Sequence, residues 1–308
     1  MNPSTMRTAM CVAIVLGSVV PFLGQWYLVN LVGTSLTLEN KPVIVWMVQG
    51  PASDHLKWYQ RFGNISHTIL VYHSYNGDCL DCILDNNRTT WLTGNNLLIR
   101  HALEIPNVKY YVRSDNDLEM ACKNNPHNDP LYCWRSFNDH LIDVDASDYP
   151  VISPKTWWDP SGEPDLYQSC PDMTLMAIRP DYLPSQFPMT TYLQDKGWNF
   201  VIHAYWEIVQ RCIPNHILTV GDWTLSNPSH NSYPQQYGPM VEKYVTDILN
   251  TAYRPIGPFS VKKRLLHRCS VSSNSPIFHD NKCLDRLKER FDKWVEMGTP
   301  LTTDQLLL

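Results

Sequence analysis

The sequence lacks the marks of a nucleic-acid-binding protein. It has no run of basic residues, and its 25 lysines and arginines are outnumbered by 30 acidic residues, so the formal net charge is −5. Nucleic acids are bound mainly through clustered positive charge, so this composition argues against such a partner. The sequence also lacks an internal repeat and a long polar linker. We therefore expect one large domain after the N-terminal segment.

Charged side chains are missing from one N-terminal stretch, Ala9 to Gly33. Because about 20 apolar residues in a helix cross a bilayer, this stretch predicts a transmembrane signal-anchor at 9–33. Arg7 before it and Glu39 well after it favour a cytoplasmic N-terminus. The alternative is a cleaved signal peptide with its core at Cys11 to Val20, but Trp26 to Val32 extends the apolar segment past the usual end of such a core.

Both alternatives send the rest of the chain into the secretory pathway. The sequons Asn64-Ile65-Ser66 and Asn87-Arg88-Thr89 agree with that placement. We expect a short cytoplasmic tail at 1–8, the anchor at 9–33, a short stem at 34–41 and a lumenal domain at 42–308.

The cysteines outside the anchor are even in number, as an oxidised framework requires. They are Cys79, Cys82, Cys122, Cys133, Cys170, Cys212, Cys269 and Cys283. Short loops favour the pairs Cys122 with Cys133 and Cys269 with Cys283. The Cys79-Leu80-Asp81-Cys82 motif is open to three interpretations, namely structural thiols, a redox pair and half a zinc site. No second CxxC accompanies it, which favours structural thiols.

Alternating strand and helix patterns open the lumenal domain. The apolar run Pro42 to Gln49 predicts a strand buried on both faces, and Thr68 to Tyr72 predicts a second strand. Between them, Ser53 is expected to cap a short helix that carries Leu56, Tyr59 and Phe62.

The same alternation continues with a helix between Trp91 and Ile105, for which Thr93-Gly94-Asn95 is the expected lead-in, and with a third strand at Val108 to Val112. This order predicts a mostly parallel sheet with right-handed crossovers. From Asp117 to Pro171 the pattern loosens. Later patterns predict strands at Met173–Ile178 and Ile217–Val220 and helices at Trp198–Arg211, at Met240–Leu249 and around Leu284 to Val295.

The triplet Asp115-Asn116-Asp117 directly follows the third predicted strand. Its carboxylates are therefore expected at the carboxyl end of a parallel sheet, where open α/β sheets bind ligands. Two carboxylates there suit Mg²⁺ or Mn²⁺, which prefer oxygen ligands and bind diphosphates readily. A second triplet, Asp143-Val144-Asp145, follows no such strand and is interpreted as a solvated turn.

With this triplet in place, the sequence resembles glycosyltransferases of the GT-A fold. The segments that carry the resemblance are Trp91-Leu92-Thr93-Gly94-Asn95-Asn96-Leu97-Leu98 and Tyr110-Tyr111-Val112-Arg113-Ser114-Asp115-Asn116-Asp117-Leu118-Glu119. The likeness is greatest to poorly characterised eukaryotic members, whose later segments resemble Cys170 to Ala177 and Asn227 to Pro234. The resemblance implies a GT-A-like α/β domain with a mostly parallel sheet flanked by helices, behind one N-terminal transmembrane helix.

The resemblance also implies a metal site. Asp115 and Asp117 match the acidic triplet that holds Mn²⁺ (or Mg²⁺) and the donor diphosphate, and His230 matches a late histidine ligand, with His203 and His216 as alternatives. The chain departs from many relatives because Ser114 and Asn116 supply no third acid.

Further roles are assigned on the same basis. Asp172 and Glu207 are the candidates for the base that takes a proton from the acceptor hydroxyl. Gly94 and Asn95 are expected to contact the nucleotide, or else to cap a helix. Tryptophans expected either to stack on sugars or to pack in the core are Trp157, Trp158, Trp206 and Trp223.

The resemblance therefore implies a metal-dependent glycosyltransferase that moves a sugar from a nucleotide-diphosphate donor to a glycan or glycoprotein acceptor. It would be a single-pass type II protein of the Golgi or endoplasmic reticulum membrane, with its bulk in the lumen. The alternative is a non-catalytic lumenal glycan-binding or protein-interaction ectodomain with the same fold.

Overall fold

The computed structural model describes residues 42–63, 65–84, 90–126, 128–146, 149–156, 165–167, 174–189, 217–228 and 281–297. All of these belong to the compact unit Pro42–Leu308. The expected anchor at 9–33, the tail and the stem lie outside them. In the part of the chain that is described, no helix has the length and apolar character needed to span a bilayer.

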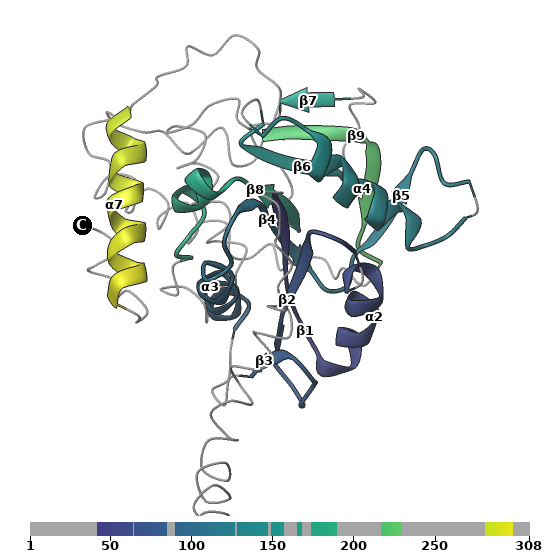
Figure 1. Cartoon of the computed structure of the whole chain (residues 1–308), viewed down its shortest axis with the longest axis horizontal. Helices are drawn as coiled ribbons and strands as arrows, with labels where there is room; N and C mark the ends of the chain where they lie inside the picture. The colour runs from purple at the N-terminus through teal and green to yellow at the C-terminus, as the bar shows by residue number, and fades with distance from the viewer. Residues whose placement is uncertain are drawn as a thin grey trace, which may run out of the picture. The chain divides into compact units, whose positions relative to one another are not determined.

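Strands and helices alternate through the first half of the domain (Figure 1). In chain order the described elements are β1 Val43–Gly50, α2 Ala52–Phe62, β2 Thr68–Ser74, β3 Cys82–Leu84, α3 Trp91–Ala102, β4 Val108–Asp115, β5 Glu119–Cys122, α4 Tyr132–Asp143, β6 Val151–Thr156, β7 Asp165–Tyr167, β8 Leu175–Ile178, the 3₁₀ helix η1 Pro180–Ser185, β9 Ile217–Ser226 and α7 Asn281–Met297.

The described strands form one mixed sheet in the order β3-β2-β1-β4-β8-β6-β9-β5, with β7 paired to β9. Strands β1 to β4 are mutually parallel, and β6 and β9 run the same way because β8 is antiparallel to both β4 and β6. Only β5, β7 and β8 run in the opposite direction among the described strands. The predicted mixed, mostly parallel sheet flanked by helices is confirmed.

Strand β1 lies inside the sheet between β2 and β4, and all eight of its residues are buried. Its continuous apolar sequence is explained by this position, because both of its faces are covered by helices. One face packs against α3, η1 and α7, and the other packs against α2 and α4. Figure 1 shows the two pairs of helices, α3 with α7 and α2 with α4, on opposite sides of the sheet.

An aromatic cluster fills the layer between β1 and the helices α2 and α4. Trp46 stacks on Phe62 with ring centroids 4.1 Å apart, and it meets Trp134 edge-on at 5.8 Å. The indole nitrogen of Trp46 donates to Asn138 at 2.9 Å, so the polar atom of this fully buried ring has a partner. The cluster therefore fixes α2 and α4 against the strand while the Trp46 indole keeps a hydrogen-bond partner.

Helix α2 differs from its sequence prediction in two respects. Pro51 is the N-cap and no side chain caps the helix, so the expected cap at Ser53 is wrong. The buried residues of α2 are Trp58, Arg61 and Phe62, whereas Leu56 and Tyr59, which the sequence analysis named with Phe62, are 63% and 44% exposed. The entry into α2 is fixed by backbone contacts instead, because the Ala52 amide donates to the Asn76 carbonyl.

The start of α3 also differs from the prediction. Its N-cap is Thr90, whose hydroxyl accepts from the Thr93 amide in a capping box. Gly94 and Asn95 therefore lie inside the helix rather than in a lead-in or at the cap. Since this capping box satisfies two backbone amides at the helix start, those of Thr90 and Thr93, it outweighs the weak helix propensity of the Gly-Asn pair.

The loosely patterned region after Asp117 contains β5, α4, β6 and β7. The predicted disulfide between Cys122 and Cys133 is confirmed and joins the end of β5 to the first turn of α4. Strand β9 is longer than predicted, since it extends to Ser226. The expected helices at Trp198–Arg211 and Met240–Leu249 lie outside the described residues.

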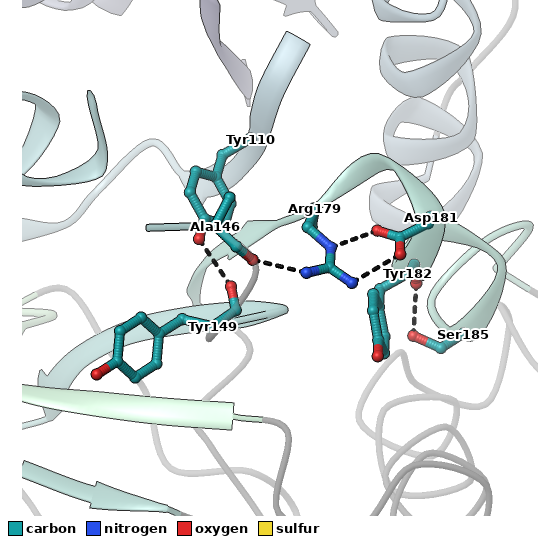
Figure 2. Close-up of polar contacts among 7 residues, drawn as sticks. All are labelled: Tyr110, Ala146, Tyr149, Arg179, Asp181, Tyr182 and Ser185. Carbon is teal, nitrogen blue, oxygen red and sulfur yellow. Dashed lines mark hydrogen bonds and ion pairs between the residues drawn. The ribbon is translucent and has the colours of Figure 1, made fainter. Parts of the chain in front are cut away.

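A polar cluster ties the end of β8 to the segment before β6. Figure 2 shows the Arg179 guanidinium between the Asp181 carboxylate and the Ala146 carbonyl oxygen, which it contacts at 2.7 and 2.6 Å. The same guanidinium lies over the Tyr182 ring. Beside it, the Tyr110 hydroxyl donates to the Tyr149 carbonyl at 2.7 Å, so β4 is also tied to the segment before β6.

Candidate functional site

The carboxyl ends of β1, β2 and β4 meet at one edge of the sheet. Gln49 of β1 is level with His73 of β2 and with Asp115, the last residue of β4. Helix α2 begins directly after β1, and α3 begins close to the same edge, since the Trp91 indole reaches Asp115. Open α/β sheets bind ligands at this edge, where loops and helix N-termini converge.

Asp115 is half-buried and held by the first residue of α3. The Trp91 indole nitrogen donates to Asp115 Oδ1 at 3.0 Å. Arg113, which is 1% exposed, lies with its guanidinium carbon 4.5 Å from the centre of the Trp91 ring. The Arg113 guanidinium therefore holds the Trp91 ring in place, and the indole nitrogen of that ring in turn orients the Asp115 carboxylate.

Gly94 and Asn95, near the start of α3, pack against Gln49 of β1. The Gln49 amide donates to the Thr90 carbonyl at 3.1 Å, and the Asn95 amide donates to the Trp91 carbonyl at 2.7 Å. A side chain at position 94 would collide with the Gln49 amide. Both residues are buried, and they hold the first turn of α3 against β1.

Asn116 and Asp117 form the turn that follows β4. The Asn116 amide donates to Asp54 Oδ2 at 2.8 Å, and its carbonyl accepts from the Trp58 indole at 3.3 Å. Within the described part of the chain, the half-buried Asp117 carboxylate accepts no hydrogen bond, so its oxygens can face a ligand. Burial raises the pKa of the nearby Tyr75 phenol, and the negative charges of Asp54 and Asp117 raise it further.

Asp54 is a functional candidate that the sequence analysis missed. It lies in the first turn of α2, and its charge acts on Tyr75 together with that of Asp117. The available signal was its place four residues after the end of a buried strand, in the first helical turn. Asp54 brings to the triplet a carboxylate that Ser114 and Asn116 do not provide.

These groups suit a hard cation with a bound anion. Carboxylate oxygens are the ligands that Mg²⁺ and Mn²⁺ prefer, and such ions keep several waters or substrate oxygens. The N-termini of α2 and α3 carry partial positive charge at the same edge, which favours a phosphate group. The residues present therefore fit the metal that the resemblance implies.

Softer ligands occur at His55, Cys79 and Cys82, the one cluster of three possible metal ligands found among the described residues. There Cys79 and Cys82 are joined in a disulfide, which agrees with a structural role for the CxxC motif. A disulfide sulfur has no thiolate to offer a metal, so a half zinc site is not formed in this state.

Several predicted site residues lie outside the described residues. These are the candidate bases Asp172 and Glu207, the candidate ligand His230 with its alternatives His203 and His216, and Trp157, Trp158 and Trp206. Trp223 is described: its indole donates to the Ser136 hydroxyl at 2.9 Å and its ring meets Phe137 edge-on. Its environment favours packing over sugar stacking.

Comparisons with known proteins find similarity among solved structures. No protein-family model matches the chain, and no curated protein matches it. Among solved structures, the chain is similar to a glycosyltransferase involved in the glycosylation of the major capsid of the virus PBCV-1. The identity is 15% and the TM-score is 0.38, over 66% of this chain and 92% of that one.

Proposed function

We propose that this protein is a metal-dependent glycosyltransferase that uses a nucleotide-diphosphate sugar as donor. The observation that carries the proposal is the position of Asp115 and Asp117 at the carboxyl edge of the parallel strands, beside the N-termini of two helices. Paired carboxylates there suit a cation, and helix N-termini suit a phosphate.

In this proposal Asp115 and Asp117 hold Mn²⁺ or Mg²⁺, with His230 as a further ligand. A cation held by these residues would supply positive charge that stabilises a departing nucleoside diphosphate. Trp91 orients the Asp115 carboxylate, and Gly94 and Asn95 set the position of α3 beside the nucleotide. Asp172 or Glu207 accepts the proton of the acceptor hydroxyl.

The acceptor in this proposal is a glycan or glycoprotein. The uncharged stretch 9–33 would anchor the enzyme in the Golgi or endoplasmic reticulum membrane as a single-pass type II protein. The disulfide between Cys122 and Cys133 supports this compartment, because disulfides persist where the environment is oxidising.

The test is donor turnover by the purified full-length protein in detergent. Release of nucleoside diphosphate from a panel of nucleotide sugars is measured with Mn²⁺, with Mg²⁺ and with chelator. We expect metal-dependent release that Asp115→Ala and Asp117→Ala each abolish while the melting temperature is retained. The matched controls are Asp143→Ala and Asp145→Ala, which alter the exposed second triplet at the end of α4 and should leave turnover unchanged.

Full turnover in chelator, or in both Asp115→Ala and Asp117→Ala, contradicts the proposal. Glycan binding on an array without any response to nucleotide or metal would instead favour the non-catalytic glycan-binding ectodomain.

A further inference from the structure

One face of α2 is attached to the turn that carries the acidic triplet. Asp54, Trp58 and Arg61 are four and three residues apart, so their side chains leave the helix on the same side. Each of them makes a hydrogen bond within residues 116–118. The sequence separation is 57 to 62 residues, so this attachment is a tertiary feature that neither segment shows alone.

The middle residue of the triplet is held from two directions. Asp54 Oδ2 accepts from the Asn116 side-chain amide at 2.8 Å, and the Trp58 indole donates to the Asn116 main-chain carbonyl at 3.3 Å. Fixing both the side chain and the peptide of Asn116 limits rotation of the peptides on either side of it. Those peptides lead directly to Asp115 and Asp117, so the directions of the two carboxylates are limited as well.

Arg61 completes the attachment from inside the core. It is 4% exposed, and its guanidinium carbon lies 4.2 Å from the Trp58 ring and 4.1 Å from the Trp134 ring. Its Nη2 donates to the Leu118 carbonyl at 3.5 Å. Burial lowers the pKa of Arg61 to about 10, so the side chain stays charged at neutral pH. A buried charge is costly without partners. The Arg61 charge is therefore stabilised only while α2 stays in the position where the two rings and the Leu118 carbonyl contact its guanidinium.

We propose that α2 is a clamp that positions the acidic triplet for metal binding, with Asp54 and Trp58 as its positioning residues. The inference rests on the proposed function, since it assigns the clamp to the same metal site. It explains how a triplet with an amide in the middle keeps two carboxylates aligned: Asp54 supplies the fixed acceptor to which that amide is bound.

The first measurement is the affinity of the metal-free protein for Mn²⁺ alone, from the electron paramagnetic resonance signal of free Mn²⁺. Asp54→Ala and Trp58→Phe should each weaken the affinity roughly 10-fold, the size of effect typical for groups that orient metal ligands. Asp54→Asn retains an oxygen that accepts from Asn116, so it should restore most of the affinity lost in Asp54→Ala. Lys57→Ala, on the exposed face of α2, and Trp223→Phe, which removes an indole bond to Ser136 instead, are the matched controls.

The second measurement is hydrogen exchange of the metal-free protein in the segment 113–120. Asp54→Ala and Trp58→Phe should speed exchange at 116–118, whereas Lys57→Ala and Trp223→Phe should not. Unchanged exchange in both clamp variants overturns the clamp, whatever the metal data show. Equal weakening of Mn²⁺ binding by Asp54→Asn and Asp54→Ala also overturns it, because charge and not position would then decide. If the wild-type protein binds no Mn²⁺, the proposed function and the metal role of the clamp both fail.

Discussion

The indole nitrogen of Trp91 lies 3.0 Å from Asp115 Oδ1, which joins the first residue of α3 to the last residue of β4. One carboxylate oxygen is thereby occupied, and the carboxylate is fixed in orientation. Trp91→Phe keeps a ring over Arg113 but removes the donor, so it should weaken Mn²⁺ affinity roughly 10-fold with little loss of stability. The Mn²⁺ titration described above measures it. Trp223→Phe removes an indole bond to Ser136 instead and should leave Mn²⁺ binding unchanged.

Gly94 provides a second prediction, which concerns stability. Alanine is the better helix former by about 1 kcal/mol, but its Cβ would displace the buried Gln49 amide from the Thr90 carbonyl. Overpacking of this kind costs about 1–3 kcal/mol, so Gly94→Ala should lower the free energy of unfolding. In the background Gln49→Ala the collision is absent, and Gly94→Ala should then be neutral or stabilising. Denaturant unfolding of the four proteins checks this double-mutant cycle, and simple additivity would contradict the contact.

Arg179 provides a third prediction, which also concerns stability. Arg179→Met retains the aliphatic stem but loses the bonds to Asp181 and to the Ala146 carbonyl (Figure 2). Since charged hydrogen bonds are lost and a half-buried carbonyl remains without this donor, we expect a loss of about 1–2 kcal/mol in unfolding free energy. Lys123→Met breaks an ion pair with Asp222 in which both side chains are more than half exposed, and should change stability little. Equal losses of unfolding free energy in Arg179→Met and Lys123→Met would contradict the prediction that the Arg179 bonds stabilise the fold.

His55 makes stability depend on pH. Burial lowers the pKa of His55 below its ordinary value of 6.5, and the charge of Asp81 partly opposes this shift. The unfolded chain therefore takes up the proton first as the pH falls below about 6.5, so the folded state loses stability there and regains it as the pH rises. Between pH 7 and pH 5 the wild-type protein should lose more stability than His55→Gln. Thermal melts at matched ionic strength decide this, and parallel pH profiles would contradict it.

The elements that deliver the acidic triplet were predictable because their signals are local. The apolar run of β1, the shorter runs of β2 and β4 and the helical spacing of α3 each depend on neighbouring residues. All four elements are present, although β2 and β4 extend past their predicted ends, to Ser74 and Asp115. The placement of Asp115 at the carboxyl edge follows from strand order alone. The wrong features were the cap of α2 and the lead-in of α3, where a proline and a threonine at the helix starts took those roles.

The rest of the candidate site is not readable from local pattern. Asp54 and Asn116 are 62 residues apart in the sequence, and no pattern near either residue predicts their hydrogen bond. Strands β5 and β6 are short, and β6 contains Pro154 at the point where its register with β9 shifts, so neither gives a strand pattern in the sequence. Their places are set by partners elsewhere in the chain, among them the disulfide of Cys122 with Cys133.

Two of the three hydrogen bonds between α2 and residues 116–118 are accepted by main-chain oxygens, those of Asn116 and Leu118. Every amino acid carries such an oxygen, so these two bonds do not depend on which side chain occupies position 116. A lineage could therefore exchange Asn116 for another neutral residue and keep the two main-chain bonds while it alters how firmly a cation is bound. Metal preference would then drift by single substitutions at one position, on a scaffold that does not need to be rebuilt.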